Sequence, residues 1–177
     1  NAATRQRYID DMARLAAMKP DYLVLMTEAD IMYRFYPAEF EAYRSVYHDA
    51  VAKVKSISPG TKVGVSFLHT LWWVNKNVDG VDVPAKLSPA DFVGFTTYPE
   101  DLIRKGVFAS ISDIPEWWYG STRQAYPVKE ILFTEVGWAS QTYGTPEIQA
   151  DYVRQLPRLM SLAKPKYITW AVLHDTG

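Results

Sequence analysis

Two glutamates, Glu28 and Glu135, each follow an apolar segment typical of a buried strand, at residues 22–26 and 130–134. If parallel strands carry them, both carboxyl groups lie at the sheet edge where α/β proteins place their chemistry. Two carboxyl groups facing each other there can cleave a glycosidic bond, one as acid and then base, the other as nucleophile. For each glutamate alone, a charge at a helix N-terminus or in a loop is an alternative that stays open.

Side chains with flat rings or polar atoms lie in or near the ends of the predicted strands and on one long loop. The chain contains 6 Trp, 12 Tyr and 7 Phe, and aromatic rings are the surfaces on which sugars stack, although most of them form cores. For His69 the alternative of a loop or core histidine is favoured, and for Trp72 core packing is an equally open interpretation. The candidate substrate-binding residues are His69, Trp72, Tyr98, Trp138, Trp170 and Asp175.

Metal, thiol and nucleotide chemistry find little support in the sequence. The chain has 3 histidines without HxH or HExxH spacing, so we expect no metal site. With 0 cysteines, disulfides and thiol catalysis are excluded. No glycine-rich phosphate loop follows an early strand. We therefore expect no metal and no organic cofactor.

Local patterns predict alternating helices and strands. Residues 70–90 are poorly patterned and predict a long loop that carries Trp72, in which Asp79-Gly80 forms the turn of a small hairpin over residues 78–83. The predicted strands cover residues 22–26, 62–67, 92–96, 130–134 and 167–173, and the predicted helices cover residues 4–18, 37–57, 113–125 and 146–163. Pro37 begins the second helix, an apolar stripe follows it, and Ser-Pro-Gly at residues 58–60 stops it. Asp113 begins the third helix, and Thr145 caps the fourth. The stripe of the second helix consists of Phe40, Tyr43, Tyr47, Ala50, Val51 and Val54.

This alternation predicts an α/β fold with a parallel sheet. Five strands in 177 residues fit either an open sheet or part of a (β/α)8 barrel, since a whole barrel takes about 250 residues. Because the phosphate loop of a doubly wound nucleotide fold is missing, the barrel is the better interpretation. We expect residues 1–177 to form a single partial domain, the C-terminal half of a (β/α)8 TIM barrel with about strands four to eight.

Composition narrows the possible partners. The 19 Lys and Arg against 20 Asp and Glu give a net charge of −1, which disfavours a protein that binds nucleic acid through its phosphates. No apolar stretch approaches the roughly 20 residues of a membrane span, and no signal peptide is recognisable. The chain opens directly into a helical pattern and ends after an apolar strand, so we expect it to be a piece of a larger protein.

Nearly the whole sequence resembles the clan A glycoside hydrolases, including their mannanase-like families, and the most specific piece of the resemblance is Leu-Phe-Thr-Glu-Val-Gly-Trp at residues 132–138. These hydrolases are (β/α)8 enzymes with an acid/base glutamate ending strand four and a nucleophile ending strand seven. The resemblance implies that Glu28 is the acid/base and Glu135 the nucleophile. It further implies that Tyr98 donates a hydrogen bond to the nucleophile and that Trp170 lies beneath the sugar that is cleaved.

The resemblance implies a retaining hydrolase of β-linked poly- or oligosaccharides, secreted or periplasmic, with the two carboxyl groups about 5–5.5 Å apart. Thr27 stands where the clan usually has Asn. Together with the missing strands, this favours a second interpretation, a non-catalytic carbohydrate-binding or interaction protein derived from such a barrel. A third interpretation, an open-sheet protein unrelated to sugars, would place Glu28 and Glu135 far apart.

The expected partners follow from the partial barrel. Five strands cannot close a barrel that takes about eight. The strands at residues 22–26 and 167–173 would then present unpaired edges, which are templates for pairing with another chain. Besides the carbohydrate, we expect either a missing N-terminal half-barrel or self-association through these edges, and an isolated chain that is inactive as a monomer.

Overall fold

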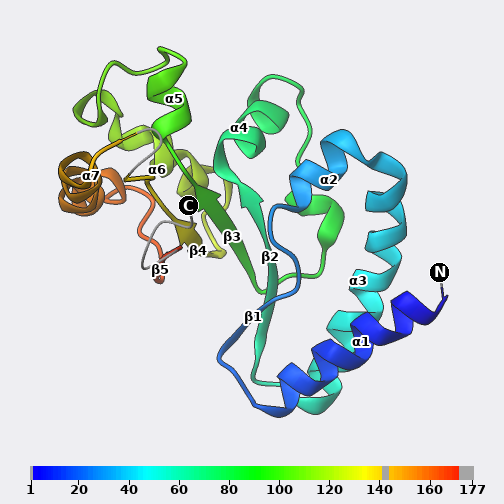
Figure 1. Cartoon of the computed structure of the whole chain (residues 1–177). Helices are drawn as coiled ribbons and strands as arrows, with labels where there is room; N and C mark the ends of the chain where they lie inside the picture. The colour runs from blue at the N-terminus through cyan, green and yellow to red at the C-terminus, as the bar shows by residue number, and fades with distance from the viewer. Residues whose placement is uncertain (1, 141–143, 172–177) are drawn as a thin grey trace. The chain divides into compact units, whose positions relative to one another are not determined.

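The computed structural model describes residues 2–140 and 144–171 (Figure 1). Its contacts divide the chain into two compact units, residues 1–95 and 96–177, which are described separately below. The elements, in chain order, are α1 (Ala2–Ala17), β1 (Tyr22–Val24), α2 (Ala29–Phe35), α3 (Pro37–Ile57), β2 (Lys62–Leu68), α4 (His69–Asn77), η1 (Pro84–Leu87), β3 (Phe92–Thr97), α5 (Glu100–Arg104), η2 (Ile111–Asp113), α6 (Glu116–Ala125), β4 (Glu130–Val136), α7 (Pro146–Leu159) and β5 (Ile168–Trp170).

The strands are hydrogen-bonded in the order β1-β2-β3-β4-β5, which is also their order along the chain. The pairs β1–β2 and β4–β5 are parallel, with Tyr22 opposite Lys62 and Phe133 opposite Ile168. The predicted α/β fold with parallel strands is thereby confirmed. A doubly wound sheet reverses its strand order at a switch point, and this order contains no reversal. Among the described residues, β1 and β5 each pair with a single neighbouring strand.

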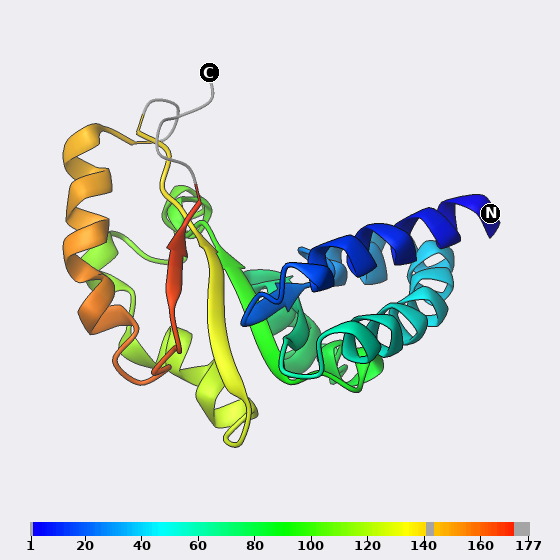
Figure 2. The ribbon, with the colours of Figure 1, turned by 90° about the horizontal axis from the view of Figure 1, so that it is seen from below.

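The first unit is built on the packing of α1 against α3, which lie side by side in Figure 2. Pro37 begins α3, as predicted, since its fixed φ suits the first helical position. Strand β1 buries Leu23 and leaves Val24 half-buried, and Leu25, directly after the strand, is also buried. The residues that α3 buries belong to its predicted stripe: Phe40, Tyr47, Ala50, Val51 and Val54.

The second unit packs α6 and α7 together and lays the Tyr119 ring of α6 edge-on against Phe133 of β4, with 5.4 Å between ring centroids. Figure 2 shows α7 running alongside β4 and β5. The approach of α6 to the segment after α7 depends on Gly120, because a Cβ there would lie 2.7 Å from Cβ of Leu162. The predicted start of α7 is confirmed, since Thr145 Oγ1 accepts the amide of Ile148 at 3.3 Å.

The predicted loop and hairpin at residues 70–90 are wrong. Residues His69–Asn77 form α4, and no strand is present over residues 78–83. The helix follows β2 directly, and its N-cap residue Leu68 makes no side-chain hydrogen bond to it, so the usual start signal is missing. The Asp79-Gly80 pair lies just beyond the end of this helix, whose C-cap is Val78, and does not turn a hairpin. Gly80 adopts φ 70° there, and Asp79 forms a salt bridge with Arg34.

The helix predicted from residue 113 begins three residues later, at Glu116. Asp113 ends the short turn η2 instead of capping α6, and its carboxylate accepts the Ser110 hydroxyl at 2.8 Å. The short helices α2 and α5 were not predicted at all. No helix in the described part of the chain is long and apolar enough to cross a membrane.

Candidate functional site at the strand ends

In the second unit, Tyr98 and Glu135 come together where β3 and β4 end. The Tyr98 hydroxyl donates to Glu135 Oε2 at 2.7 Å. The backbone joins the same two strand ends, since the amide of Gly137 donates to the carbonyl of Thr97 at 3.1 Å. The hydrogen bond from Tyr98 to Glu135 is the one that the resemblance implied.

Gly137 makes this contact possible. A Cβ at residue 137 would overlap the Tyr98 ring, which lies directly against the glycine Cα. The ring therefore approaches the backbone directly after β4 more closely than any other residue type at position 137 would allow. The glycine within residues 132–138 is thus explained by the position of the tyrosine that holds Glu135.

Two tryptophans of the second unit share one tyrosine neighbour. The Tyr152 ring lies 5.2 Å from Trp138 and 6.3 Å from Trp170, measured between ring centroids. Trp138 is only 5% exposed and Trp170 is half-buried. The Trp138 carbonyl also accepts the side-chain amide of Gln149 at 2.6 Å, which joins it to α7. Of the two predicted sugar-contacting rings, Trp170 therefore has the greater exposed surface.

A buried series of hydroxyls lies behind these residues. Thr97 Oγ1 and the Tyr119 hydroxyl are 3.0 Å apart, and the Tyr119 and Tyr152 hydroxyls are 3.3 Å apart. Burial raises the pKa of Tyr119 to about 12 and that of Tyr152 well above its ordinary value. Both phenols therefore stay protonated. They link the residue before Tyr98 to the two tryptophans, a role that the sequence analysis missed because only tertiary contacts reveal it.

In the first unit, Glu28 lies in the turn between β1 and α2. Its backbone is left-handed, with φ 55° and ψ 47°, and its carbonyl accepts the amide of Ile31 at 3.0 Å. A residue with a Cβ pays roughly 1–2 kcal/mol in this conformation. Such strain concentrates at functional sites, where the surrounding structure holds it in place. Glu28 is half-buried.

Asp30, two residues later, is a buried carboxyl group that the sequence analysis did not single out. It is 0% exposed, and its Oδ1 accepts the backbone amide of Leu68 at 3.0 Å. Burial, with a smaller contribution from the charge of Glu28, raises the pKa of Asp30 to about 7. The only signal in the sequence was its place in the first turn after a strand, which many exposed aspartates share.

His69 and Trp72 belong to an aromatic cluster inside the first unit. The His69 ring lies 5.4 Å from Trp72 and 5.8 Å from Phe95, and Trp72 lies 5.0 Å from Phe95. Both His69 and Trp72 are 1% exposed. Of the two open interpretations for Trp72, the structure shows the core-packing one.

The strand ends thus carry two groups of predicted residues, each within its own unit. The first unit holds Glu28, His69 and Trp72, and the second holds Tyr98, Glu135, Trp138 and Trp170. Asp175 lies outside the described residues, and the separation of the two glutamates stays a prediction.

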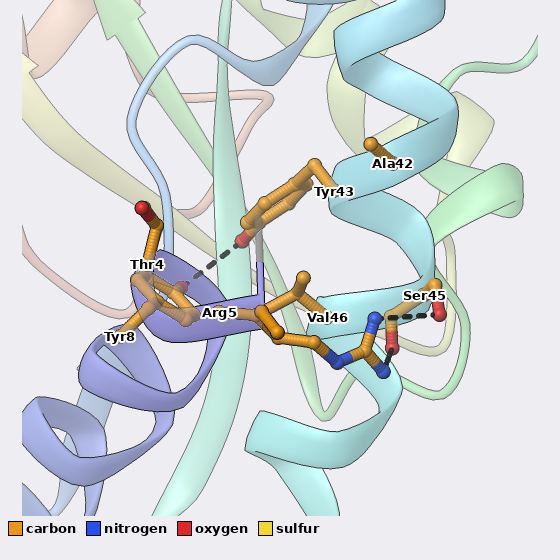
Figure 3. Close-up of a pocket in the computed structure, with 8 residues that line it drawn as sticks. Thr4, Arg5, Tyr8, Ala42, Tyr43, Ser45 and Val46 are labelled. Carbon is orange, nitrogen blue, oxygen red and sulfur yellow. Dashed lines mark hydrogen bonds between the residues drawn. The ribbon is translucent and has the colours of Figure 1, made fainter.

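A cavity of about 450 Å³ lies elsewhere in the first unit, between α1 and α3 (Figure 3). The Tyr8 hydroxyl donates to the carbonyl of Leu25 at 2.5 Å and lies 3.3 Å from the hydroxyl of Tyr43. The Arg5 guanidinium donates to Ser45 Oγ at 2.9 Å. None of the residues predicted for catalysis or sugar binding lines this cavity, so it is separate from the candidate site.

Within residues 2–140 and 144–171, no three side chains of His, Asp or Glu gather into a group that could hold a metal ion. The sequence matches no protein-family model, and no curated protein matches it. The geometry of the strand ends is therefore what supports a function for this chain.

Proposed function

We propose that the chain is the second half of a (β/α)8 retaining glycoside hydrolase that acts on β-linked poly- or oligosaccharides. The observation that carries this proposal is the 2.7 Å hydrogen bond from Tyr98 to Glu135 at the ends of two strands. Supporting it, the parallel strands follow one another without a reversal, as in a singly wound barrel.

In this proposal Glu135 is the nucleophile and Glu28 the acid/base. The Glu135 carboxylate attacks the anomeric carbon while Glu28 gives a proton to the departing glycosidic oxygen. The resulting glycosyl ester on Glu135 is then hydrolysed by a water that loses its proton to Glu28. Both carboxyl groups end the cycle in their original states.

The assignment of Glu135 is tested by Glu135→Ala in the full-length protein, with aryl β-glycosides as substrates. We expect kcat to fall by at least about 10³-fold, because the covalent step is lost. Azide takes the place of the carboxylate and restores part of the rate. Glu130→Ala, at the opposite end of β4, is the matched control and keeps its activity. Turnover by Glu135→Ala at the wild-type rate would disprove the assignment.

The assignment of Glu28 is tested by Glu28→Ala with aryl glycosides of different leaving-group acidity. Poor leaving groups depend on protonation, so their rates fall by about 10²–10⁴-fold. Activated leaving groups depart without a proton and lose much less. An equal loss on all substrates would exclude Glu28 as the acid.

We further propose that the edges of β1 and β5 pair with additional strands, either in the rest of a longer protein or in a second copy. The support is their position at the two ends of the strand order, since an open edge exposes unpaired backbone groups. Light scattering on the isolated chain, combined with a glycosidase assay, tests this. A monomer with full activity would contradict the proposal, and glycan binding without turnover would favour a non-catalytic binding protein.

A further inference from the structure

Asp30 is a buried carboxyl group that the proposed mechanism does not use. It lies in the first turn of α2, with its whole side chain removed from solvent. Burying a carboxyl group costs free energy unless hydrogen bonds compensate. Its Oδ1 has such a bond, from the amide of Leu68, while its Oδ2 has no hydrogen-bond partner among the described residues.

We propose that Asp30 is a positioning residue for Glu28, which it serves by holding the β1–α2 turn against the carboxyl end of β2. The inference rests on the proposed function for the identification of Glu28 as the acid/base. The fastening itself does not depend on that function. It joins two segments that lie 38 residues apart in sequence.

The hydrogen bonds fix the turn on both sides of Asp30. The carbonyl of Glu28 accepts the amide of Ile31, which closes the turn locally. The bond from Leu68 to Asp30 then fastens the closed turn to β2 at 3.0 Å. A left-handed residue other than glycine persists only where its surroundings over-determine it. Asp30 supplies the long-range part of that constraint.

The packing of α2 leaves this fastening little freedom. The helix lies against α3, β2 and α4, and Ala29 beside Asp30 is also fully buried. Leu68 is the last residue of β2 and leads directly into α4. Movement of the turn away from β2 would therefore leave the Leu68 amide and the Asp30 carboxyl buried together without their bond, which costs more than the bond alone contributes.

The charged surroundings of Asp30 are compatible with a neutral carboxyl group that still accepts the amide. Glu28 is the charged neighbour that acts on it, and it disfavours a second negative charge. Arg34, at the far end of α2, is engaged by Asn75 and Asp79. His69, which follows Leu68, packs against the rings of the aromatic cluster. The structure thus shows no cation bound to Asp30 among the described residues.

The fastening is tested without any enzyme assay by NMR on two variants of the chain. Asp30→Asn keeps an acceptor for the Leu68 amide, whereas Asp30→Ala removes it. We expect amide exchange at Leu68 to accelerate about 10-fold in Asp30→Ala, as the loss of one hydrogen bond predicts, and to stay within about 3-fold of wild type in Asp30→Asn. The backbone shifts of Glu28 lose their left-handed signature in Asp30→Ala alone.

The exposed Asp10, on α1, supplies the matched control, and Asp10→Ala leaves Leu68 and Glu28 unchanged. Unchanged exchange at Leu68 and unchanged Glu28 shifts in Asp30→Ala would overturn the inference. If Asp30→Ala fails to fold, the result for Asp30→Asn decides, because that variant keeps the shape and the acceptor. Loss of Leu68 protection in Asp30→Asn would show that the fastening does not work as proposed.

Kinetics of the full-length protein then separate positioning from general structural damage. We expect Asp30→Ala to lower kcat by about 10–100-fold with KM within about 3-fold of wild type, and Asp30→Asn to recover most of kcat. Equal losses in both variants would overturn the positioning role. A wild-type protein without glycosidase activity would instead refute the proposed function, while the NMR result would still decide whether Asp30 holds the turn.

Discussion

Glu28 and Glu135 both stand at strand ends, yet the two units hold them by different physical means. Glu135 is held by side chains, since Tyr98 donates to its carboxylate and Gly137 lets the tyrosine ring approach. Glu28 is held by its backbone, in a left-handed turn that the bond from Leu68 to Asp30 fastens to β2. The position of Glu135 therefore depends on close side-chain packing, whereas the position of Glu28 depends on a few hydrogen bonds of a strained turn.

The largest expected effect concerns the second unit, in which side chains hold Glu135. Tyr152→Ala removes a fully buried ring that touches Trp138 and Trp170, and truncating a buried aromatic ring costs about 3–5 kcal/mol. Urea unfolding followed by tryptophan fluorescence measures it. Tyr152→Phe is the control and loses about 1 kcal/mol with the hydroxyl contact. Equal losses of stability in the two variants would show that packing of the Tyr152 ring does not stabilise the second unit.

The next effect concerns the first unit, in which a turn holds Glu28, and it is a change of stability with pH. The pKa of Asp30 is raised in the folded state from 3.8 to about 7, so the folded chain binds an additional proton between these values. Wild-type stability relative to Asp30→Asn is therefore greatest below about pH 4 and falls by up to about 1.4 kcal/mol per pH unit until about pH 7. Urea unfolding of both proteins from pH 4 to 8 measures the difference, and a difference independent of pH would contradict a raised pKa.

Gly137→Ala tests the close approach of Tyr98. The added methyl group overlaps the ring, so either the ring or the backbone shifts, at a cost of about 1–3 kcal/mol. We also expect the hydrogen bond to Glu135 to lengthen and kcat to fall. Gly60→Ala is the control, since nothing lies within 4 Å of a Cβ at that position. Normal stability and kcat in Gly137→Ala would show that the position of Glu135 does not depend on the close approach of the Tyr98 ring.

The smallest expected effect is a gain. Glu28→Gly relieves the left-handed conformation and stabilises the chain by about 1 kcal/mol, while it removes the proposed acid. Lys19→Gly, at the comparable φ of 53°, gives a similar gain without affecting activity. Thermal unfolding measures the stability of both variants, and the glycosidase assay measures their activity. Destabilisation by Glu28→Gly would show that the glutamate side chain itself holds the turn.

Local sequence patterns determined most of the regular structure. The helix α3 begins at Pro37 and ends at Ile57, as its sequence predicts, because the apolar spacing and the start and stop signals lie within the helix and its flanks. The cap at Thr145 was visible for the same reason. Each predicted strand core is also present, since each is a short apolar run between helices. The helix α4 was not predicted, because no side-chain cap marks its start.

Tertiary structure alone decided which polar side chains are buried and what they touch. The bond from Leu68 to Asp30 spans 38 residues, and the hydroxyl contacts of Tyr119 with Thr97 and Tyr152 span 22 and 33. No local period encodes such pairs, because they form only when separate elements pack and exclude water around them. The sequence by itself located the two glutamates at strand ends. The packing of the chain decided that a tyrosine holds one of them and a strained turn the other.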